Sequence, residues 1–368
     1  MKKFYSNLCQ ILAASLLLSV LTLIPRAMAA DIYIHYDTGW GNHIALRGDG
    51  GGLNWSNGIT ANWTAGNVWH INTPQSGGGF NVKPLLNDQS WSIGANYHVP
   101  DGSAQVHIWP YFSHNGNSLV QFNYYSNTLG NVRTVRVLLP PSYNENTLKS
   151  YPVLYMHDGQ NLFSAATSSF GVEWQVDETA ESLMSQGLMQ EAIIVGIDNA
   201  GGARISEYTP SVDASYGGGN GDSYLDAIEN ELKPYIESTY RAKTGAQNTL
   251  MMGSSLGGLI SFYAGWTRSD VYGKVAGMSS SFWWDSEQLV NTVQNHSTAS
   301  PQADFYIDIG GNEGSVSSSQ LMNSALLSQG FVQGQNMYYY YDANGSHTES
   351  SWRNRLVIPL QYLLPWQN

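Results

Sequence analysis

The sequence predicts an α/β protein in which a small antiparallel β-sandwich precedes a doubly wound, mostly parallel sheet with helices on both faces. Two patterns lead to this expectation. Residues 30–115 contain short alternating apolar runs broken by Gly, Asn and Pro, which is typical of a sandwich. Residues 119–368 alternate strand-length apolar runs with helical stretches, which favours parallel strands covered by helices.

Residues 1–29 have the features of a secretory signal peptide. Lys2 and Lys3 precede an apolar run over 11–24, and Ala27-Met28-Ala29 resembles a cleavage site, with the cut after its last alanine. The apolar run is short for a segment that spans a bilayer. We therefore expect a secreted or periplasmic protein without a membrane anchor after cleavage.

Cysteine content and charge exclude several kinds of chemistry. The only cysteine, Cys9, lies in the signal segment, so the mature chain has no disulfide, catalytic thiol or cysteine-ligated metal. Loss of Lys2, Lys3 and Arg26 reduces the basic residues from 16 to 13 against 28 acids, a net charge of −15. This charge disfavours nucleic acid and anionic membranes as partners.

The first of the two predicted parts is rich in tryptophan. Its alternating runs include 32–36 and 106–109, and the segment 80–97 resembles the strand–turn–strand of starch-binding-like sandwiches. Exposed tryptophans would stack on sugar rings, whereas the large burial energy of aromatic side chains favours a place in the core. The six tryptophans concerned are Trp40, Trp55, Trp63, Trp69, Trp91 and Trp109.

The second part contains seven apolar runs of strand length. Between two of them, apolar residues recur at helical spacing over 224–240, with Ser223 as a candidate cap and Pro234 as a candidate kink. In such folds the reactive groups lie beyond the C-terminal ends of the strands. The seven runs are 132–139, 153–157, 192–197, 249–252, 275–278, 305–309 and 337–341.

One motif carries nucleophile chemistry. The fourth run leads into Gly253-Ser254-Ser255-Leu256-Gly257, and a helical stretch follows. This is G-x-S-x-G between a strand and a helix, the setting of a nucleophilic serine in the α/β-hydrolase fold. Glycines two positions on either side of Ser255 allow a tight turn, and the helix start directs N–H groups at a developing oxyanion.

The base and the acid should follow Ser255 along the chain. His347 comes after the last predicted strand and a glycine-containing turn, whereas His296 lies in a polar loop with no clear strand before it. For the acid we prefer Glu313, in the loop after the run 305–309. Asp308 inside that run is the rival, and Asp285 is a third candidate.

The oxyanion hole needs two backbone N–H groups. Leu256, directly after the serine, supplies one, and Gln160 or a neighbour after the early strand 153–157 supplies the other. His157 and Asp158 lie beside this turn, but no clustered partners favour a metal site there.

Five segments resemble the esterase D-like branch of the α/β hydrolases, which includes siderophore, feruloyl and acetyl-xylan esterases and mycolyltransferase relatives. The resemblance covers about residues 130–360 and implies a Ser255–Glu313–His347 triad. It also implies that Trp174, Arg204 and Trp284 line the acyl or alcohol pocket, with core packing and a surface ion pair as the alternatives. The segments are Leu139–Tyr143, Tyr155–Phe163, Ile197–Asn199 with Arg204 and Glu207–Pro210, Glu231–Ile236, and Ser281–Trp284.

We therefore expect an exported serine esterase that needs no metal or organic cofactor. It would act on short-acyl or aromatic-acyl esters, either small molecules or polysaccharide-linked. A siderophore ester is a further possible substrate, and an acyltransferase of the mycolyltransferase type is an alternative activity. The non-enzymatic alternative is a glycan-binding protein with an inactive hydrolase domain.

Overall fold

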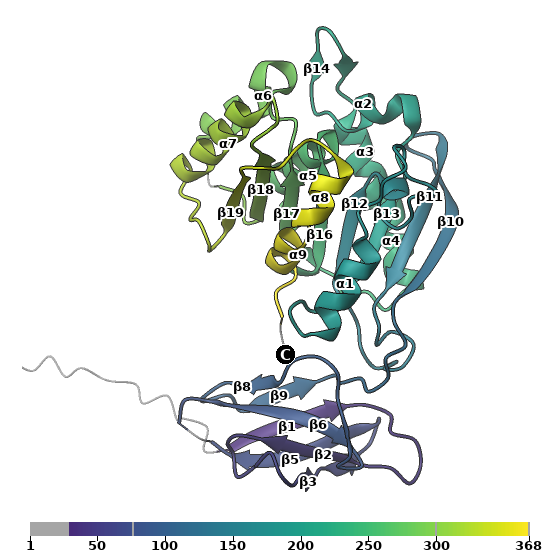
Figure 1. The fold of residues 1–368 in the computed structure, drawn as a ribbon, viewed down its shortest axis with the longest axis vertical. Coiled ribbons are helices and arrows are strands. Elements are labelled where there is room, and N and C mark those ends of the chain that lie inside the picture. Colours follow the sequence, from purple (N-terminus) through teal and green to yellow (C-terminus); the bar gives the residue numbers. More distant parts are fainter. Residues whose placement is uncertain (1–28, 76, 299, 367–368) are drawn as a thin grey trace, which may run out of the picture.

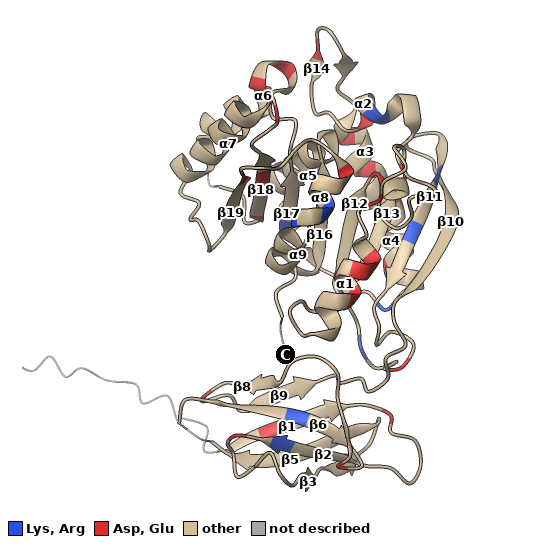
Figure 2. Cartoon of the chain, in the orientation of Figure 1, with Lys and Arg blue, Asp and Glu red and all other residues tan. Residues whose placement is uncertain are grey.

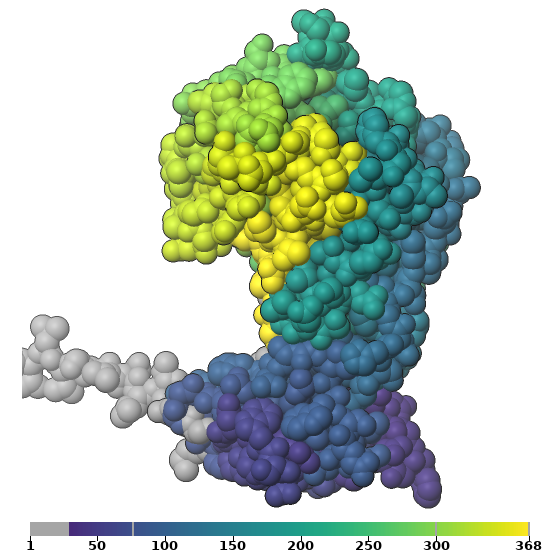
Figure 3. Space-filling model, in the orientation of Figure 1, coloured from purple at the N-terminus to yellow at the C-terminus, as the bar shows by residue number. Residues whose placement is uncertain are grey.

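A computed structural model of the chain describes residues 29–75, 77–298 and 300–366. The predicted signal peptide, apart from Ala29, lies outside the described residues. Figure 1 shows a β-sandwich below a large sheet that is flanked by helices. In Figure 3 the C-terminal chain, coloured yellow, runs from the upper part down towards the sandwich.

The sandwich consists of two small sheets. One has the order β4-β5-β1-β9, the other has the order β3-β2-β6-β7, and β8 pairs with β6. Most pairs are antiparallel as expected, but β9 pairs in parallel with β1. The strands are β1 (Ala29–His35), β2 (Ile44–Gly48), β3 (Ile59–Thr60), β4 (Asn62–Thr64), β5 (Val68–Pro74), β6 (Phe80–Leu86), β7 (Ser90–Trp91), β8 (Tyr97–Val99) and β9 (Gln105–Ile108).

The tryptophans of the sandwich do not fill its core. Of the six, Trp69 is buried, Trp109 is half-buried, and the other four are exposed. The core is built mainly from smaller side chains such as Ile32, Ile34 and Val82, which alternate inward along their strands. The expectation that most tryptophans are buried is therefore wrong. Because the inward positions are already taken by aliphatic residues, the indole rings lie on the outward faces.

An eight-stranded sheet forms the second part, in the order β10-β11-β13-β12-β16-β17-β18-β19. All seven predicted strands are confirmed. The neighbouring strands β13, β12, β16, β17, β18 and β19 run parallel to one another. The antiparallel edge strand β10 was not predicted, since most of its residues are exposed and show no clean alternation. The strands are β10 (Ser118–Ser126), β11 (Asn131–Leu139), β12 (Val153–His157), β13 (Ile193–Ile197), β16 (Thr249–Ser254), β17 (Lys274–Met278), β18 (Asp304–Gly310) and β19 (Met337–Asp342).

Helices cover both faces of this sheet. Alternate residues of β12 point to opposite sides, Tyr155 into one core and Met156 into the other. Helices α3 to α7 pack on the first core, and α1, α8 and α9 on the second (Figure 1). The helices are α1 (Val176–Ser185), α2 (Arg204–Glu207), α3 (Gly221–Ala227), α4 (Lys233–Thr239), α5 (Leu256–Thr267), α6 (Trp284–Gln294), α7 (Val316–Ser328), α8 (Glu349–Arg355) and α9 (Val357–Leu363). A short hairpin of β14 (Val212–Asp213) and β15 (Gly217–Gly218) lies between α2 and α3.

The helix expected over 224–240 starts earlier and changes geometry in the middle. It begins at Gly221, so Ser223 lies inside it and is not its cap. A π-helical stretch, η3 (Ile228–Leu232), joins α3 to α4, and Pro234 lies in the first turn of α4. Proline lacks the N–H that a continuous helix needs, so the regular pattern is interrupted just before it.

Charged side chains are sparse over both parts (Figure 2), as the 12% content of the sequence predicts. Among the residues that the structure describes, no helix is long and apolar enough to cross a membrane.

Candidate active site

Ser255 occupies the turn between β16 and α5. Its backbone has φ 58° and ψ −123°, an unfavourable conformation for a residue with a side chain. The strand and its neighbours hold it there, because the Ser255 N–H donates to the Met278 carbonyl and the Ser255 carbonyl accepts from Ser281 N–H, both at 3.0 Å. Strain of this kind persists only where the surroundings impose it, and it is characteristic of a nucleophile turn.

Gly253 makes this turn possible. A Cβ atom at Gly253 would lie 2.6 Å from the carbonyl carbon of Gly257 and 2.9 Å from Cδ2 of His157. Both distances are far below van der Waals contact, so no side chain fits at this position. The glycine therefore allows the start of α5 to fold back closely over the end of β16.

His347 and Glu313 come together from two loops on the same edge of the sheet. Nδ1 of His347 lies 2.8 Å from Oε2 of Glu313. Glu313 Oε1 also accepts from the Ser279 hydroxyl at 2.7 Å and from the Gly310 N–H at 2.9 Å. Burial acts to raise the pKa of Glu313, but these hydrogen bonds, that of His347 first, hold it below its usual value. The carboxylate therefore stays ionised next to the imidazole.

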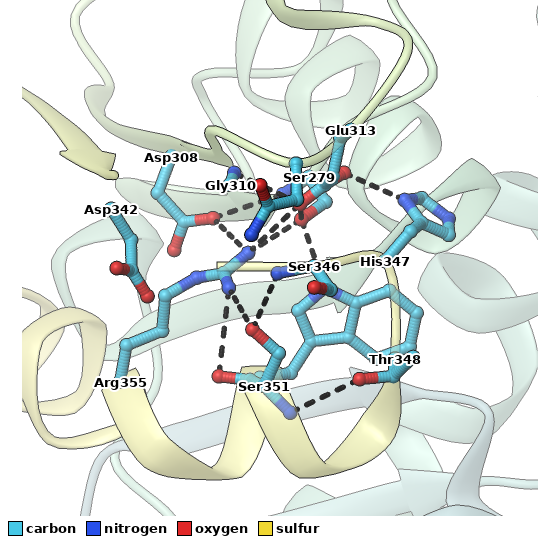
Figure 4. Close-up of polar contacts among 12 residues, drawn as sticks. Ser279, Asp308, Gly310, Glu313, Asp342, Ser346, His347, Thr348, Ser351 and Arg355 are labelled. Atoms are coloured by element: carbon cyan, nitrogen blue, oxygen red, sulfur yellow. Dashed lines mark hydrogen bonds and ion pairs between the residues drawn. The ribbon is translucent and has the colours of Figure 1, made fainter. Parts of the chain in front are cut away.

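A buried network fixes the position of Glu313 (Figure 4). Arg355 Nη2 donates to the Ser279 hydroxyl at 2.5 Å and to Asp308 Oδ1 at 2.9 Å. Trp352 Nε1 also donates to the Ser279 hydroxyl, at 2.9 Å. Ser279 therefore connects two α8 side chains, Trp352 and Arg355, to the Glu313 carboxylate and holds this carboxylate in position.

The other two acid candidates do not reach the imidazole. Asp308 is fully buried and accepts from Arg355, from the Tyr306 hydroxyl and from the Ser279 N–H. Burial raises its pKa, although Arg355 opposes the shift. Asp285 lies at the start of α6, with no contact to His347 among the described residues. Of the three carboxylates, the geometry favours Glu313.

Ser255 and His347 line one cavity of about 350 Å³. Within the described residues, the one hydrogen-bond partner of the Ser255 hydroxyl is Ser281 Oγ, at 3.4 Å. The His347 side chain is 42% exposed, and the edge of its ring contacts Trp352. The lining residues are Asp158, Asn161, Ser169, Phe170, Asn199, Arg204, Ser254, Ser255, His347, Glu349 and Trp352.

Of the three predicted pocket residues, only Arg204 lines this cavity. It forms a two-point ion pair with Asp158, at 2.8 Å from both Nε and Nη2. Trp174 is buried in the second core, on which α1, α8 and α9 pack, and it contacts Trp352 with ring centroids 5.6 Å apart. Trp284 is buried on the opposite side of the sheet and donates to the Ser211 carbonyl. The two tryptophans therefore occupy core positions.

The two predicted oxyanion residues lie in the first turns of two helices that follow β16 and β12. Leu256 is the first residue of α5, and Gln160 is the middle residue of the short turn η1 (Gly159–Asn161) after β12. Neither backbone N–H donates to another group in the part of the chain that the structure describes. Gln160 itself does not line the cavity, but Asp158 and Asn161 on either side of it do.

Sequence reasoning missed Glu349. This residue is buried, lines the cavity and has no hydrogen bond or ion pair to its carboxylate among the described residues. Its position two residues after the predicted base was the available signal. Sequence alone could not show that α8 directs this residue to the cavity.

His157 is the residue below the Ser255 turn. It is fully buried, and its Nδ1 lies 2.9 Å from the Tyr224 hydroxyl. Burial lowers the pKa of His157 to about 3, so the ring is neutral at pH 7. Across the described ranges, no three His, Cys, Asp or Glu side chains are grouped so as to hold a metal ion.

Comparison with known proteins shows the family to which the chain belongs. Residues 126–363 match the family model described as "Putative esterase", which covers more than half of the chain. The chain belongs to this family. As a member of the esterase family, it is a carboxylic ester hydrolase with the α/β-hydrolase fold.

Individual proteins are similar to this chain in sequence or in fold. The chain is 32% identical over 188 residues to the uncharacterized protein YbbA of Bacillus subtilis, which covers 50% of this chain and 69% of that protein. It is 30% identical over 143 residues to the siderophore triacetylfusarinine C esterase of Aspergillus fumigatus, but this match covers only 37% of this chain and 46% of that protein. The enterobactin esterase FES of Shigella flexneri superposes over 87% of both chains with a TM-score of 0.55 and 18% identity, a likeness of fold.

Proposed function

We propose that this esterase is exported and acts through a Ser255–Glu313–His347 triad. The observation that carries the proposal is the strained Ser255 turn, which shares a cavity with an imidazole held by a buried, ionised carboxylate. We further propose that residues 1–29 are removed on export, and that 30–115 and 119–368 are separate domains.

The proposed reaction is acyl transfer to water through an acyl-enzyme. His347 takes the proton of Ser255 as its oxygen attacks the ester carbonyl, and Glu313 stabilises the resulting imidazolium. The Leu256 and Gln160 N–H groups, which have no acceptor among the described residues, hold the oxyanion. His347 then protonates the leaving alcohol, and water attacks the acyl group in the reverse sequence. The Ser255–His347 hydrogen bond forms on substrate binding, as is common for catalytic contacts that are long in the free enzyme.

The cavity lining favours a substrate that has a short or compact acyl group and hydroxyl groups near the ester bond. Asp158 neutralises Arg204, while Arg204 Nη1 and Asn161 Nδ2 have no protein partner among the described residues and remain available as donors. Glu349 adds an unpaired acceptor. A hydroxylated group can satisfy both donors and acceptor, whereas a long alkyl chain would leave them buried and unpaired. We therefore propose a short-acyl or aromatic-acyl ester of a hydroxylated compound as the substrate.

The decisive experiment replaces Ser255 with alanine in the mature protein. We expect wild-type protein to hydrolyse 4-nitrophenyl acetate and to be labelled by a fluorophosphonate probe, and Ser255→Ala to lose both activities. Ser281→Ala is the matched control, since it removes the neighbouring hydroxyl and keeps the proposed nucleophile. Undiminished turnover by Ser255→Ala would overturn the proposal.

Exposed tryptophans on the sandwich support an additional role in polysaccharide binding. Trp55 and Trp91 lie side by side with centroids 6.3 Å apart, and the Arg47 guanidinium lies 5.2 Å from the Trp91 ring centroid. Aromatic faces of this kind stack on sugar rings. We expect the protein to sediment with insoluble polysaccharide, and the double variant Trp55→Ala/Trp91→Ala to remain in solution. Equal sedimentation of both proteins would contradict this role.

A further inference from the structure

A second cavity lies at the junction between the sandwich and the α/β part. It has a volume of about 170 Å³ and shares no lining residue with the cavity beside Ser255. The sandwich and the C-terminal chain supply its aromatic walls, and the segments that lead into β12, β13 and β16 supply its charges. The residues that define its chemistry are Tyr97, Trp109, Lys149, Glu191, Lys243 and Trp366.

The walls of this junction cavity are held by hydrogen bonds between the two parts. Glu145 accepts from the Tyr36 hydroxyl at 2.9 Å and from the Phe112 N–H at 2.6 Å. Asn146 Nδ2 donates to the carbonyls of His35 at 2.9 Å and Pro110 at 2.8 Å. The junction is therefore built before any ligand arrives, which reduces the entropy that binding has to overcome.

The junction cavity carries one uncompensated positive charge. The buried Glu191 carboxylate accepts from Lys149 Nζ at 2.5 Å and from the Ser142 hydroxyl at 2.6 Å, so the charge of Lys149 is balanced. Lys243 lines the same cavity, and no carboxylate among the described residues pairs with its ammonium group. Lys243 is exposed to solvent over part of its surface, and its partial burial, followed by the positive charge of Lys149, lowers its pKa. An anion in the cavity would offset both effects, because an opposite charge stabilises the ammonium form of Lys243.

Two fixed indole rings form the apolar walls. Trp109 stacks on His35 with centroids 4.6 Å apart and planes at 10°, it also contacts His107 with centroids 6.0 Å apart, and it lines the cavity. Trp366 packs on Tyr97 with centroids 5.9 Å apart. A Cβ at Gly94 would lie 3.3 Å from the Trp366 ring, so the glycine lets that ring approach closely. Rigid aromatic walls bind flat or cyclic groups without losing much side-chain entropy.

We propose that the junction cavity binds a small ligand consisting of one ring with a carboxylate, the ring against Trp109 and Trp366 and the carboxylate on Lys243. The volume of about 170 Å³ restricts the ligand to a single ring, since pockets that hold drug-sized ligands measure about 300–1,000 Å³. Sugar acids and aromatic acids share this chemistry. The site is separate from the ester-cleaving one and does not depend on the proposed triad.

Isothermal titration calorimetry on the full mature chain tests this site. The ligands are galacturonate and 4-hydroxybenzoate, each compared with its uncharged counterpart, galactose or phenol. Lys243→Gln is the test variant, and Lys274→Gln is the matched control, since Lys274 does not line the cavity and pairs with Asp304 on the neighbouring strand β18. We expect at least one acid to bind more tightly than its uncharged counterpart and Lys243→Gln to weaken it about tenfold or more, because a hydrogen bond between charged groups is lost.

Each outcome bears on the proposal. Binding of galacturonate alone identifies a sugar-acid site, and binding of 4-hydroxybenzoate alone identifies an aromatic-acid site. Trp366→Ala should weaken the binding of either ligand. Hydrolysis of 4-nitrophenyl acetate should stay unchanged in Lys243→Gln and Trp366→Ala, which shows that both variants are folded. The proposal is overturned if neither acid binds, if the uncharged counterparts bind equally well, or if Lys243→Gln binds as wild type does. Loss of ester hydrolysis in Ser255→Ala leaves this result unaffected.

Discussion

The guanidinium of Arg355 is paired with the carboxylate of Asp308, with 2.9 Å between Nη2 and Oδ1 and both side chains buried. This pair removes Asp308 from the reach of His347. It also leaves Glu313, five residues further along the chain in the loop after β18, as the carboxylate that contacts the imidazole.

The two roles, a catalytic one proposed for Glu313 and a structural one for Asp308, can be tested directly. Glu313→Gln should lower kcat/KM about 10²–10⁴-fold with little change in stability, because the amide cannot stabilise the imidazolium. Asp308→Asn should instead destabilise the protein by about 3–5 kcal/mol, because it removes the nearer carboxylate of buried Arg355 and leaves only Glu313, at 3.6 Å. Ester kinetics and urea unfolding on both variants measure the two effects. A larger kinetic loss in Asp308→Asn than in Glu313→Gln would reverse the assignment.

The Ser255 turn should not tolerate a side chain at Gly253. A Cβ there meets backbone at 2.6 Å, so Gly253→Ala must shift the start of α5 and with it Ser255. We expect loss of fluorophosphonate labelling together with a lower melting temperature. Gly314→Ala is the matched control, since a Cβ at that position has no heavy atom within 4 Å and the residue lies next to Glu313. Full labelling of Gly253→Ala would show that the turn is looser than described.

Buried His157 should make stability depend on pH. Its pKa is lowered from 6.5 to about 3 by burial, so between these values the unfolded chain binds a proton that the folded chain does not. The stabilising contribution is complete above the unfolded pKa and is lost as the pH falls towards the folded one. The expected loss is about 1.4 kcal/mol per pH unit in that window. Urea unfolding from pH 7 to pH 4 should show a shallower pH dependence for His157→Gln than for wild type, and identical slopes would contradict the prediction.

Glu349 should discriminate against negatively charged acyl groups. Its unpaired carboxylate lines the cavity, so an anionic substrate is repelled by a charge at close range. Glu349→Gln should raise the ratio of kcat/KM for 4-nitrophenyl hemisuccinate to that for 4-nitrophenyl acetate about tenfold, which corresponds to about 1.4 kcal/mol. Asp270→Asn removes an exposed acid elsewhere and should leave the ratio unchanged. If Glu349→Gln also leaves it unchanged, the carboxylate does not face the acyl group.

Local pattern determined much of this protein. Apolar runs of strand length predict seven strands of the large sheet, because strand formation there depends on neighbouring residues. The turn at Ser255 between β16 and α5 follows from Gly253, because a short-range steric limit excludes a side chain at that position. The sequence also identified Glu313 and His347 as candidates, because loops after late strands meet at one edge of a parallel sheet.

The tertiary structure decided what depends on partners that are distant in sequence. Arg355, on α8, pairs with Asp308 and so favours Glu313 over it, and the same helix brings Glu349 to the cavity. Trp174 and Trp284 lie in the two cores, while most tryptophans of the sandwich lie outside its core. A tryptophan suits either a core or a binding surface by composition. Only the packing of surrounding elements determines which environment each ring occupies.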